Sequence, residues 1–394
     1  MIKRTWAGHR SLVIGVAAVA VVAILASSLL LVAATGGLSQ ASATPGATPT
    51  DSPSPSPTDS PVPTPTLFVP PTPTINTGPT PLPAGMAYAD LDGVVTSASL
   101  AHRLPIAIMV DDQKAARPQS GFSTASIVYM APADGDIDRY MMVFQEGAGT
   151  DIGPIRSARP YYVLWADEYK AIYGHYGGDT KSLRTVIPAN MRNIYNMDAI
   201  HTTGCPYHRI TTRPAPHNAY TNVAIMIACA AKQHFPSTYQ NMLTRPFKDS
   251  EAPELRPTAQ SISITYPTIT VGYQYSPSTD SYLRLLGGVP QVDPANKQKV
   301  FASSIVVLYQ PFTSDLSGEG GKHAYRPDVH NLGSGKAIVF QEGKQIAATW
   351  KKKANTSLTR LYDASGNEIS LVRGEIFIQV IAPNLPNKYK VTVK

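Results

Sequence analysis

The sequence predicts an α/β N-terminal domain followed by a mostly β C-terminal domain, preceded by a transmembrane helix and a disordered Pro/Thr/Ser-rich stalk. Three observations support this fold class. An uncharged apolar segment and a proline-rich segment occupy the first part of the 394-residue chain. Short apolar runs then alternate with helical patterns, which is typical of α/β layers. Later in the chain, polar and apolar residues alternate between Gly, Asn and Asp turns, which is typical of β-hairpins.

The apolar segment, residues 12–34, reads LVIGVAAVAVVAILASSLLLVAA and contains no charged residue. As a helix it would span about 34 Å, enough to cross a bilayer. Its basic neighbours all lie within residues 1–11, which are therefore predicted to be a cytoplasmic tail. We expect a single-pass protein of the cell membrane with its N-terminus inside and most of the chain extracytoplasmic. The alternative is a cleaved signal peptide, because Ala41-Ser-Ala43 has the form of a cleavage site.

The stalk comprises residues 35–84 and includes the run TPTDSPSPSPTDSPVPTPT. Such a composition cannot build a core and favours extended polyproline conformations. The folded chain is predicted to consist of an α/β domain at residues 85–250 and a β-rich domain at residues 255–394. Because the sequence pattern changes near residue 245, we expect the second domain to fold separately.

In the first domain, apolar runs bounded by Pro, Gly or Asp predict strands, and apolar residues at helical spacing predict helices. The predicted strands are residues 105–110, 125–131, 141–145 and 171–175. The predicted helices are residues 161–170, 180–186 and 221–235.

The net charge of +7 favours anionic surroundings, and cell-wall polymers qualify as well as nucleic acid. No basic run carries interleaved aromatic residues, so nucleic acid is not an expected partner. We find no cofactor motif and expect no metal site. Cys205 and Cys229 could form a disulfide in an oxidising compartment, and Cys229 could equally be a small core residue of a helix.

The stretch GPIRSARPYY places Arg156 and Arg159 just before a helix that is predicted to begin near Pro160. Positive charge at a helix N-terminus opposes the helix dipole, so an anion should compensate it. The anion could belong to a ligand or to the protein's own Asp111, Asp112 or Asp134. We expect a mixed arrangement, with one arginine tied to Asp111 or Asp112 and the other facing solvent.

Three further polar groups follow predicted strands or precede a predicted helix. Asp111 and Asp112 directly follow the first strand, where α/β sheets commonly bind ligands. His175 ends the fourth strand before a glycine turn, and it could shuttle protons or be a hydrogen-bonded core residue. His217 and Asn218 lie near the start of the last helix, where Asn218 could bind a ligand or serve as a cap.

The chain resembles the YerB-like bacterial lipoproteins, a two-domain family carrying the domain of unknown function 3048. The blocks RLPIAIMVDDQKAARPQSGFSTASIVY, GPIRSARPYYVLWADEYKAIYGHYGG and APHNAYT resemble its first domain. The block NLGSGKAIVFQEGKQIAATWKKKANTSLTRLYDASGNEISL and the run IFIQVIAP resemble its second. Typical members carry a lipid-attachment cysteine near the N-terminus. This chain has none there, so we expect the helix at residues 12–34 to replace the lipid.

These observations predict a membrane-anchored extracytoplasmic protein. The leading hypothesis is a cell-envelope binding or assembly module that recognises an anionic wall polymer or an envelope protein. The alternative is an envelope hydrolase of phosphoesters or glycans that uses Asp111 or Asp112, His175 and the two arginines. The hydrolase requires these side chains to lie within hydrogen-bond reach of one another around an open pocket.

Overall fold

The computed structural model describes residues 82–202, 207–239, 242–314 and 326–394. Residues 76–394 form one compact unit. The predicted transmembrane segment, residues 12–34, and most of the predicted stalk lie outside the described residues. Within the described ranges, no helix combines the length and apolar character needed to cross a membrane.

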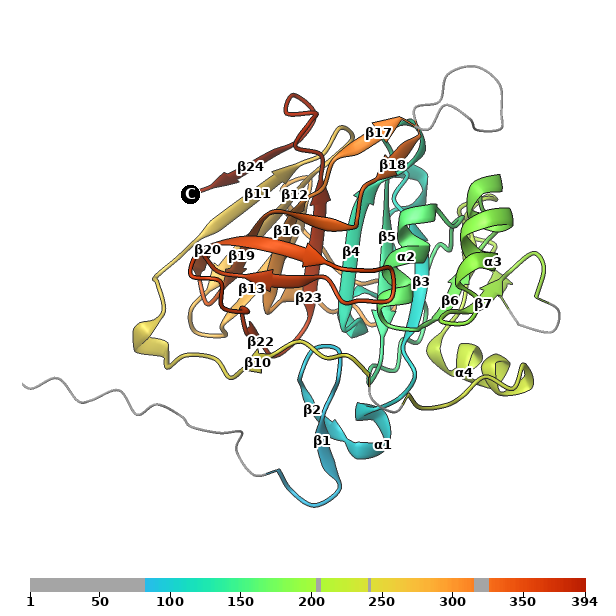
Figure 1. Cartoon of the computed structure of the whole chain (residues 1–394), viewed down its shortest axis with the longest axis horizontal. Coiled ribbons are helices and arrows are strands. Elements are labelled where there is room, and N and C mark those ends of the chain that lie inside the picture. Colours follow the sequence, from blue (N-terminus) through green and yellow to red (C-terminus); the bar gives the residue numbers. More distant parts are fainter. Residues whose placement is uncertain (1–81, 203–206, 240–241, 315–325) are drawn as a thin grey trace, which may run out of the picture. The chain divides into compact units, whose positions relative to one another are not determined.

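A ten-stranded mixed sheet runs through the centre of the folded region (Figure 1). Its order is β21(Arg360–Tyr362), β20(Lys344–Lys352), β19(Gly333–Gln341), β16(Ser304–Tyr309), β23(Ile376–Ile381), β4(Ile127–Pro132), β5(Asp138–Phe144), β3(Ile106–Asp111), β6(Ile172–His175) and β7(Tyr195–Asp198). The first five strands come from the C-terminal half of the chain and the last five from the N-terminal half.

The two halves meet where β23 pairs in parallel with β4, in the register Ile376↔Ile127 to Gln379↔Met130. Both strands are buried along their whole length, as expected for central strands of a sheet covered on both faces. One cluster of buried apolar side chains includes residues from both halves. The expectation that residues 255–394 fold separately stays a prediction, and this pairing bears on it because removing either half would expose a buried strand edge.

A second sheet belongs entirely to the C-terminal half. Its order is β14(Val289–Pro290), β13(Ser281–Leu286), β12(Thr270–Ser276), β11(Ser261–Thr265) and β24(Lys390–Val393), and β15(Phe301–Ala302) also pairs with β13. Four small sheets complete the strands: β1(Met86–Tyr88) with β2(Val95–Ser97), β8(His208–Arg209) with β9(Ala219–Tyr220), β10(Phe247–Lys248) with β22(Leu371–Val372), and β17(Phe312–Ser314) with β18(Pro327–Val329).

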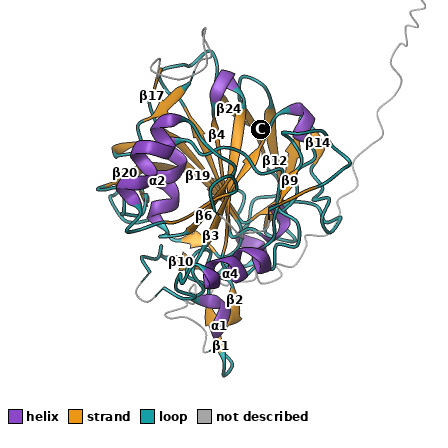
Figure 2. Ribbon diagram, turned by 90° about the vertical axis from the view of Figure 1, so that its right-hand side faces the viewer, coloured by secondary structure: helices purple, strands orange, loops and turns teal. Residues whose placement is uncertain are grey.

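Helices are few among the described residues, and Figure 2 shows them outside the strands. The α-helices are α1(Ala98–Ala101), α2(Pro160–Glu168), α3(Ile187–Asn190) and α4(Val223–Lys232), and a π-helical turn at Ser182–Val186 precedes α3. Helix α2 begins at Pro160 as predicted, because proline suits the first helical position. Asn222 caps α4 by accepting a hydrogen bond from the backbone N–H of Ile225. The described chain is thus more β-rich than an alternating α/β layer predicts.

A buried ion pair also joins the two halves. The Nζ atom of Lys352, on β20, lies 2.9 Å from Oε1 of Glu168, on α2, and both side chains are fully buried. The same carboxylate accepts hydrogen bonds from the backbone N–H and the hydroxyl of Thr359. Since nearly every polar atom of this pair is satisfied, it fixes α2 against β20.

We predict that Lys352→Met lowers the free energy of unfolding by about 3–5 kcal/mol, because it removes the nearer of the two cations that face the buried Glu168 carboxylate and leaves Arg245, at 3.8 Å, as the other. Urea denaturation of the full chain in a mild detergent measures this change. Lys353→Met is the matched control, since Lys353 is the exposed neighbour and should change stability by less than about 0.5 kcal/mol. A loss below about 1 kcal/mol for Lys352→Met would contradict the role assigned to the pair.

Candidate functional site

The candidate site lies at the edge where three parallel strands end. Strands β3, β6 and β7 run parallel to one another, and their last residues are Asp111, His175 and Asp198. Ligands of open α/β sheets bind beyond the carboxyl ends of such strands. The sequence therefore places a titratable side chain at the end of each strand of this edge.

Asp111 is the centre of one polar cluster at this edge. Its carboxylate is 1% exposed and accepts hydrogen bonds from the backbone N–H of Gln113 and from Nδ1 of His217, the latter at 2.7 Å. The Nε atom of Arg156 lies 3.3 Å from the same Oδ2 atom. The sequence predicted Asp111, Arg156 and His217 as candidates, and the structure brings these three together.

His217 is held in one tautomer by this contact. Because the Asp111 carboxylate can only accept, the Nδ1–H of His217 donates to it, which leaves Nε2 as the acceptor of the neutral ring. Among the described residues, Nε2 has no hydrogen-bond partner, and the side chain is 11% exposed. A carboxylate that orients a histidine in this way is the arrangement of a general base.

Arg156 lies in an extended segment whose backbone is hydrogen-bonded to β3 on one side and to the residue after β6 on the other. Its backbone N–H donates to the Met109 carbonyl of β3, and its carbonyl accepts from the Tyr176 N–H, just beyond β6. The side chain is 25% exposed, and burial lowers the pKa of its guanidinium while the Asp111 charge raises it. In the part of the chain that the structure describes, Asp111 is its one ion-pair partner, so the guanidinium keeps hydrogen-bond donors for another acceptor.

Arg159 is the more buried of the two arginines. Its guanidinium forms a bidentate ion pair with the Asp134 carboxylate, in which Nε lies 2.9 Å from Oδ1. Its Nη1 atom also lies 3.6 Å from Oδ2 of Asp179. Its side chain is 6% exposed. The expected mixed arrangement is therefore right for the arginine tied to Asp111 and wrong for the other, which faces internal carboxylates rather than solvent. These carboxylates supply the compensating charge at the start of α2.

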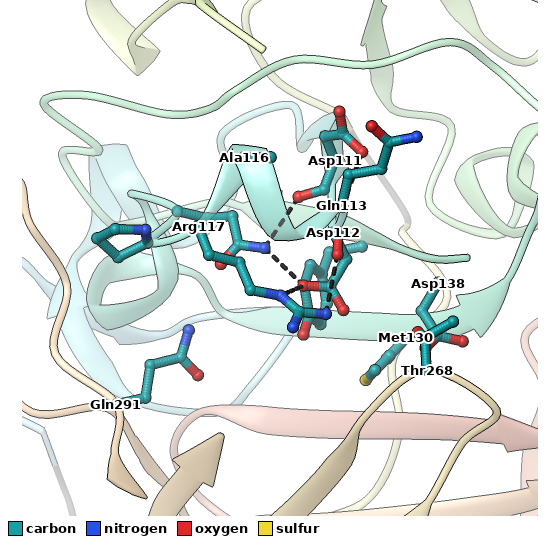
Figure 3. A network of polar contacts seen from close by, with 12 residues as sticks. Asp111, Asp112, Gln113, Ala116, Arg117, Met130, Asp138, Thr268 and Gln291 are labelled. Atoms are coloured by element: carbon teal, nitrogen blue, oxygen red, sulfur yellow. Dashed lines mark hydrogen bonds and ion pairs between the residues drawn. The ribbon is translucent and has the colours of Figure 1, made fainter. Parts of the chain in front are cut away.

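Asp112 points away from Asp111, as Figure 3 shows. Its Oδ1 atom accepts from Nε of Arg117 at 2.9 Å and from the Gln119 amide at 2.7 Å. Burial raises the pKa of Asp112, and the hydrogen bonds from Arg117 and Gln119 partly oppose this rise. The neighbouring Asp138 is also fully buried, and burial followed by the Asp112 charge raises its pKa. Asp112 therefore belongs to a second polar network and not to the Asp111 cluster.

His175 is fully buried and does not contact Asp111. Its Nδ1 lies 2.7 Å from the Gly177 carbonyl oxygen, and its Nε2 lies 2.8 Å from the side-chain amide of Asn196. Burial lowers the pKa of the ring, opposed by the nearby Asp198 charge. Both ring nitrogens are thus engaged in holding the turn after β6. The four-residue hydrolase cluster that combined His175 with Asp111, Arg156 and Arg159 is not formed.

Asn218 joins a contact that the sequence analysis missed. Its side-chain oxygen accepts from Arg209 at 2.5 Å, and its amide nitrogen donates to the Ile210 carbonyl. The Arg209 guanidinium lies over the Tyr176 ring, 4.7 Å from its centroid. Arg209 precedes a coil segment without a recognisable motif, so no sequence signal marked it.

The predicted disulfide involves one residue that lies outside the described residues, Cys205. Cys229 lies on α4 and is 1% exposed, consistent with a place in the core. Within the described chain, no group of three or more His, Cys, Asp or Glu side chains is arranged to hold a metal ion.

We predict that His175 makes the protein less stable in acid. Its folded pKa lies below the ordinary value of 6.5, so the unfolded chain binds the proton more readily. The stability that the neutral ring contributes is present above about pH 6.5 and is lost as pH falls through the folded pKa. The stability of the wild type relative to His175→Gln should therefore decrease below pH 6.5, by at most about 1.4 kcal/mol per pH unit. Denaturant titrations from pH 5 to 8 measure it, and parallel profiles would contradict it.

Comparison with known proteins shows the family of this chain. Residues 91–236 match the model "Protein of unknown function (DUF3048) N-terminal domain", and residues 262–378 match the corresponding C-terminal domain. The chain is 29% identical over 302 residues to "Putative lipoprotein YerB" of Bacillus subtilis (strain 168), covering 74% of this chain and 86% of that protein. The crystal structure of the YerB protein from Bacillus subtilis matches with a TM-score of 0.67 at 25% identity, covering 78% of this chain and 99% of that one. The chain therefore belongs to the YerB-like family of two-domain DUF3048 proteins.

Proposed function

We propose that this protein is a membrane-associated, extracytoplasmic envelope module that binds an anionic group at the carboxyl edge of β3, β6 and β7. Two features support the location. The similar Bacillus subtilis protein is named as a lipoprotein, and residues 12–34 have the length and apolar character of a membrane anchor. The Pro-rich segment that follows would separate the folded region from the bilayer.

The observation that carries the binding proposal is the incomplete pairing of Arg156. Its one carboxylate partner, Asp111, also accepts from His217 and from a backbone N–H. Arg159, by contrast, faces two carboxylates. An arginine that shares its counterion and stays partly exposed retains donors in a fixed fork, which suits a carboxylate or phosphate oxygen pair.

Arg209 adds a second positive charge to the same surface. Among the described residues it donates to the neutral amide of Asn218, and it stacks on Tyr176, whose backbone N–H donates to the Arg156 carbonyl. The second carboxylate of this edge, Asp198, accepts hydrogen bonds from the backbone N–H groups of Gly177 and Ile200, so the two guanidinium groups keep donors for another acceptor. A phosphate or carboxylate group of a wall polymer or of an envelope protein has the complementary charge.

We predict that Arg156→Met weakens binding of glycerol 3-phosphate by about tenfold or more, because a charge-assisted hydrogen bond contributes about 1.5–3 kcal/mol. Isothermal titration of the full chain in detergent measures the dissociation constant, with glycerol as the uncharged comparison ligand. Arg184→Met is the control, since Arg184 is exposed and lies outside the site. Equal affinities for the wild type and Arg156→Met, or no saturable binding, would contradict the proposal.

A second candidate function is hydrolysis of a phosphoester, favoured by the 2.7 Å contact between Asp111 and His217. In this mechanism, Nε2 of His217 removes a proton from an attacking water while Arg156 stabilises the charge that develops on the substrate oxygens. His217 takes the role that the sequence analysis assigned to His175.

If the protein hydrolyses bis(4-nitrophenyl) phosphate, we predict that His217→Asn lowers the rate by about 10²–10⁴-fold. Release of 4-nitrophenolate by the full chain measures the rate. His208→Asn is the control, because His208 is exposed and pairs only loosely with Asp151. An inactive wild type would exclude this candidate and leave the binding proposal standing.

A further inference from the structure

A pocket of about 460 Å³ lies between the two halves of the chain, apart from the Asp111 cluster. One wall is the loop Arg117–Gln119, which follows β3. The other is formed by the end of β13, by β14 and by the following loop as far as Lys297. Its lining is mainly apolar and includes Val289 and Val292, whose exposed fractions of 65% and 40% are high for valine.

Two buried carboxamides line this pocket. Gln119 is fully buried, and its amide nitrogen donates to the Asp111 carbonyl at 2.9 Å and to Asp112 at 2.7 Å. Gln291 is 6% exposed, and its Oε1 atom accepts a hydrogen bond from Arg284. Figure 3 shows Gln291 across from Arg117.

One polar atom of each carboxamide has no partner among the described residues: Oε1 of Gln119 and Nε2 of Gln291. Leaving a buried donor or acceptor unpaired costs about 1–3 kcal/mol, so a group that pairs with both atoms would be favoured at this pocket. One unpaired atom is an acceptor and the other a donor. A ligand amide, which carries one N–H and one C=O, satisfies both.

The rim of the pocket is positive. Lys297 is exposed and forms no ion pair within the described ranges, and Arg117 adds a guanidinium that is neutralised by Asp112. The one carboxylate of the adjoining loop, Asp293, is turned away, because it accepts hydrogen bonds from the backbone of Gly121 and Ser123. A carboxylate on the ligand would therefore meet an unpaired lysine at this rim.

We propose that this pocket binds the carboxyl-terminal end of a peptide: an apolar side chain fills the pocket, a backbone amide pairs with Gln119 and Gln291, and the carboxylate lies toward Lys297. The proposal is independent of the anion site. Asp111 and Asp112 point to opposite sides of the chain, so the anion site and this pocket use different side chains.

The test uses N-acetyl-leucyl-alanine, with a free carboxylate, and its C-terminal amide as the matched ligand. Titration into the full chain in detergent, followed by calorimetry, should show saturable binding that is tighter for the acid.

Gln291→Glu changes the unpaired donor into an acceptor at constant shape, and it should weaken the binding of both ligands about tenfold. Lys297→Gln should weaken the acid several-fold and leave the amide unchanged. Lys299→Gln, at an exposed lysine outside the pocket, is the control and should change neither.

Val289→Asp provides a variant that does not depend on a buried side chain, because Val289 is 65% exposed. It places a negative charge on the pocket wall and should abolish binding of the acid while the melting temperature stays unchanged. Absence of saturable binding by either ligand would overturn the proposal, as would affinities that Gln291→Glu and Val289→Asp leave unaltered. Because Arg156→Met should not affect this titration, failure here is distinguishable from failure of the anion site.

Discussion

The parallel pairing of β4 with β23 is the contact on which the rest of the fold depends. Each strand is buried along its length, and each would be the edge of a five-stranded sheet without the other. An apolar edge strand with unpaired backbone groups is unstable in water and prone to aggregation. The pairing removes both edges at once, and it joins segments of the chain that lie about 250 residues apart, as the register Ile376↔Ile127 shows. The two halves therefore match separate domain models of one family but form one continuous sheet.

This continuity explains where the other contacts between the halves occur. Lys352 reaches Glu168 across the face of the shared sheet, and the Asp293 loop closes against the backbone of Gly121 and Ser123. The pocket between Arg117 and Lys297 arises at the second of these junctions. The walls of this pocket come from both domains of the family, so a ligand there would bind only while the two domains remain joined.

The sequence predicted the local elements well because local signals determine them. Proline at position 160 marked the start of α2, an apolar run bounded by Pro and Asp marked β3, and a short run that ends before a glycine turn marked β6. The pairing of β4 with β23 could not be predicted, because a change in pattern reports local structure, whereas strand pairing across half the chain leaves no local signal. Arg209 was missed for the same reason: its neighbours Tyr176 and Asn218 are brought to it only by the tertiary fold.

The sequence prediction left open whether Asp111 or Asp112 serves the site, and strand geometry narrows that choice. Side chains at successive positions of a strand point to opposite faces, so two adjacent aspartates at a strand end must serve different surroundings. Asp111 faces His217 and Arg156, and Asp112 faces Arg117. Gln119 connects the two, because its amide nitrogen donates to the carbonyl of the first and the carboxylate of the second. Gln119 therefore fixes the backbone at the end of β3, while the two carboxylates on either side of it serve different surroundings.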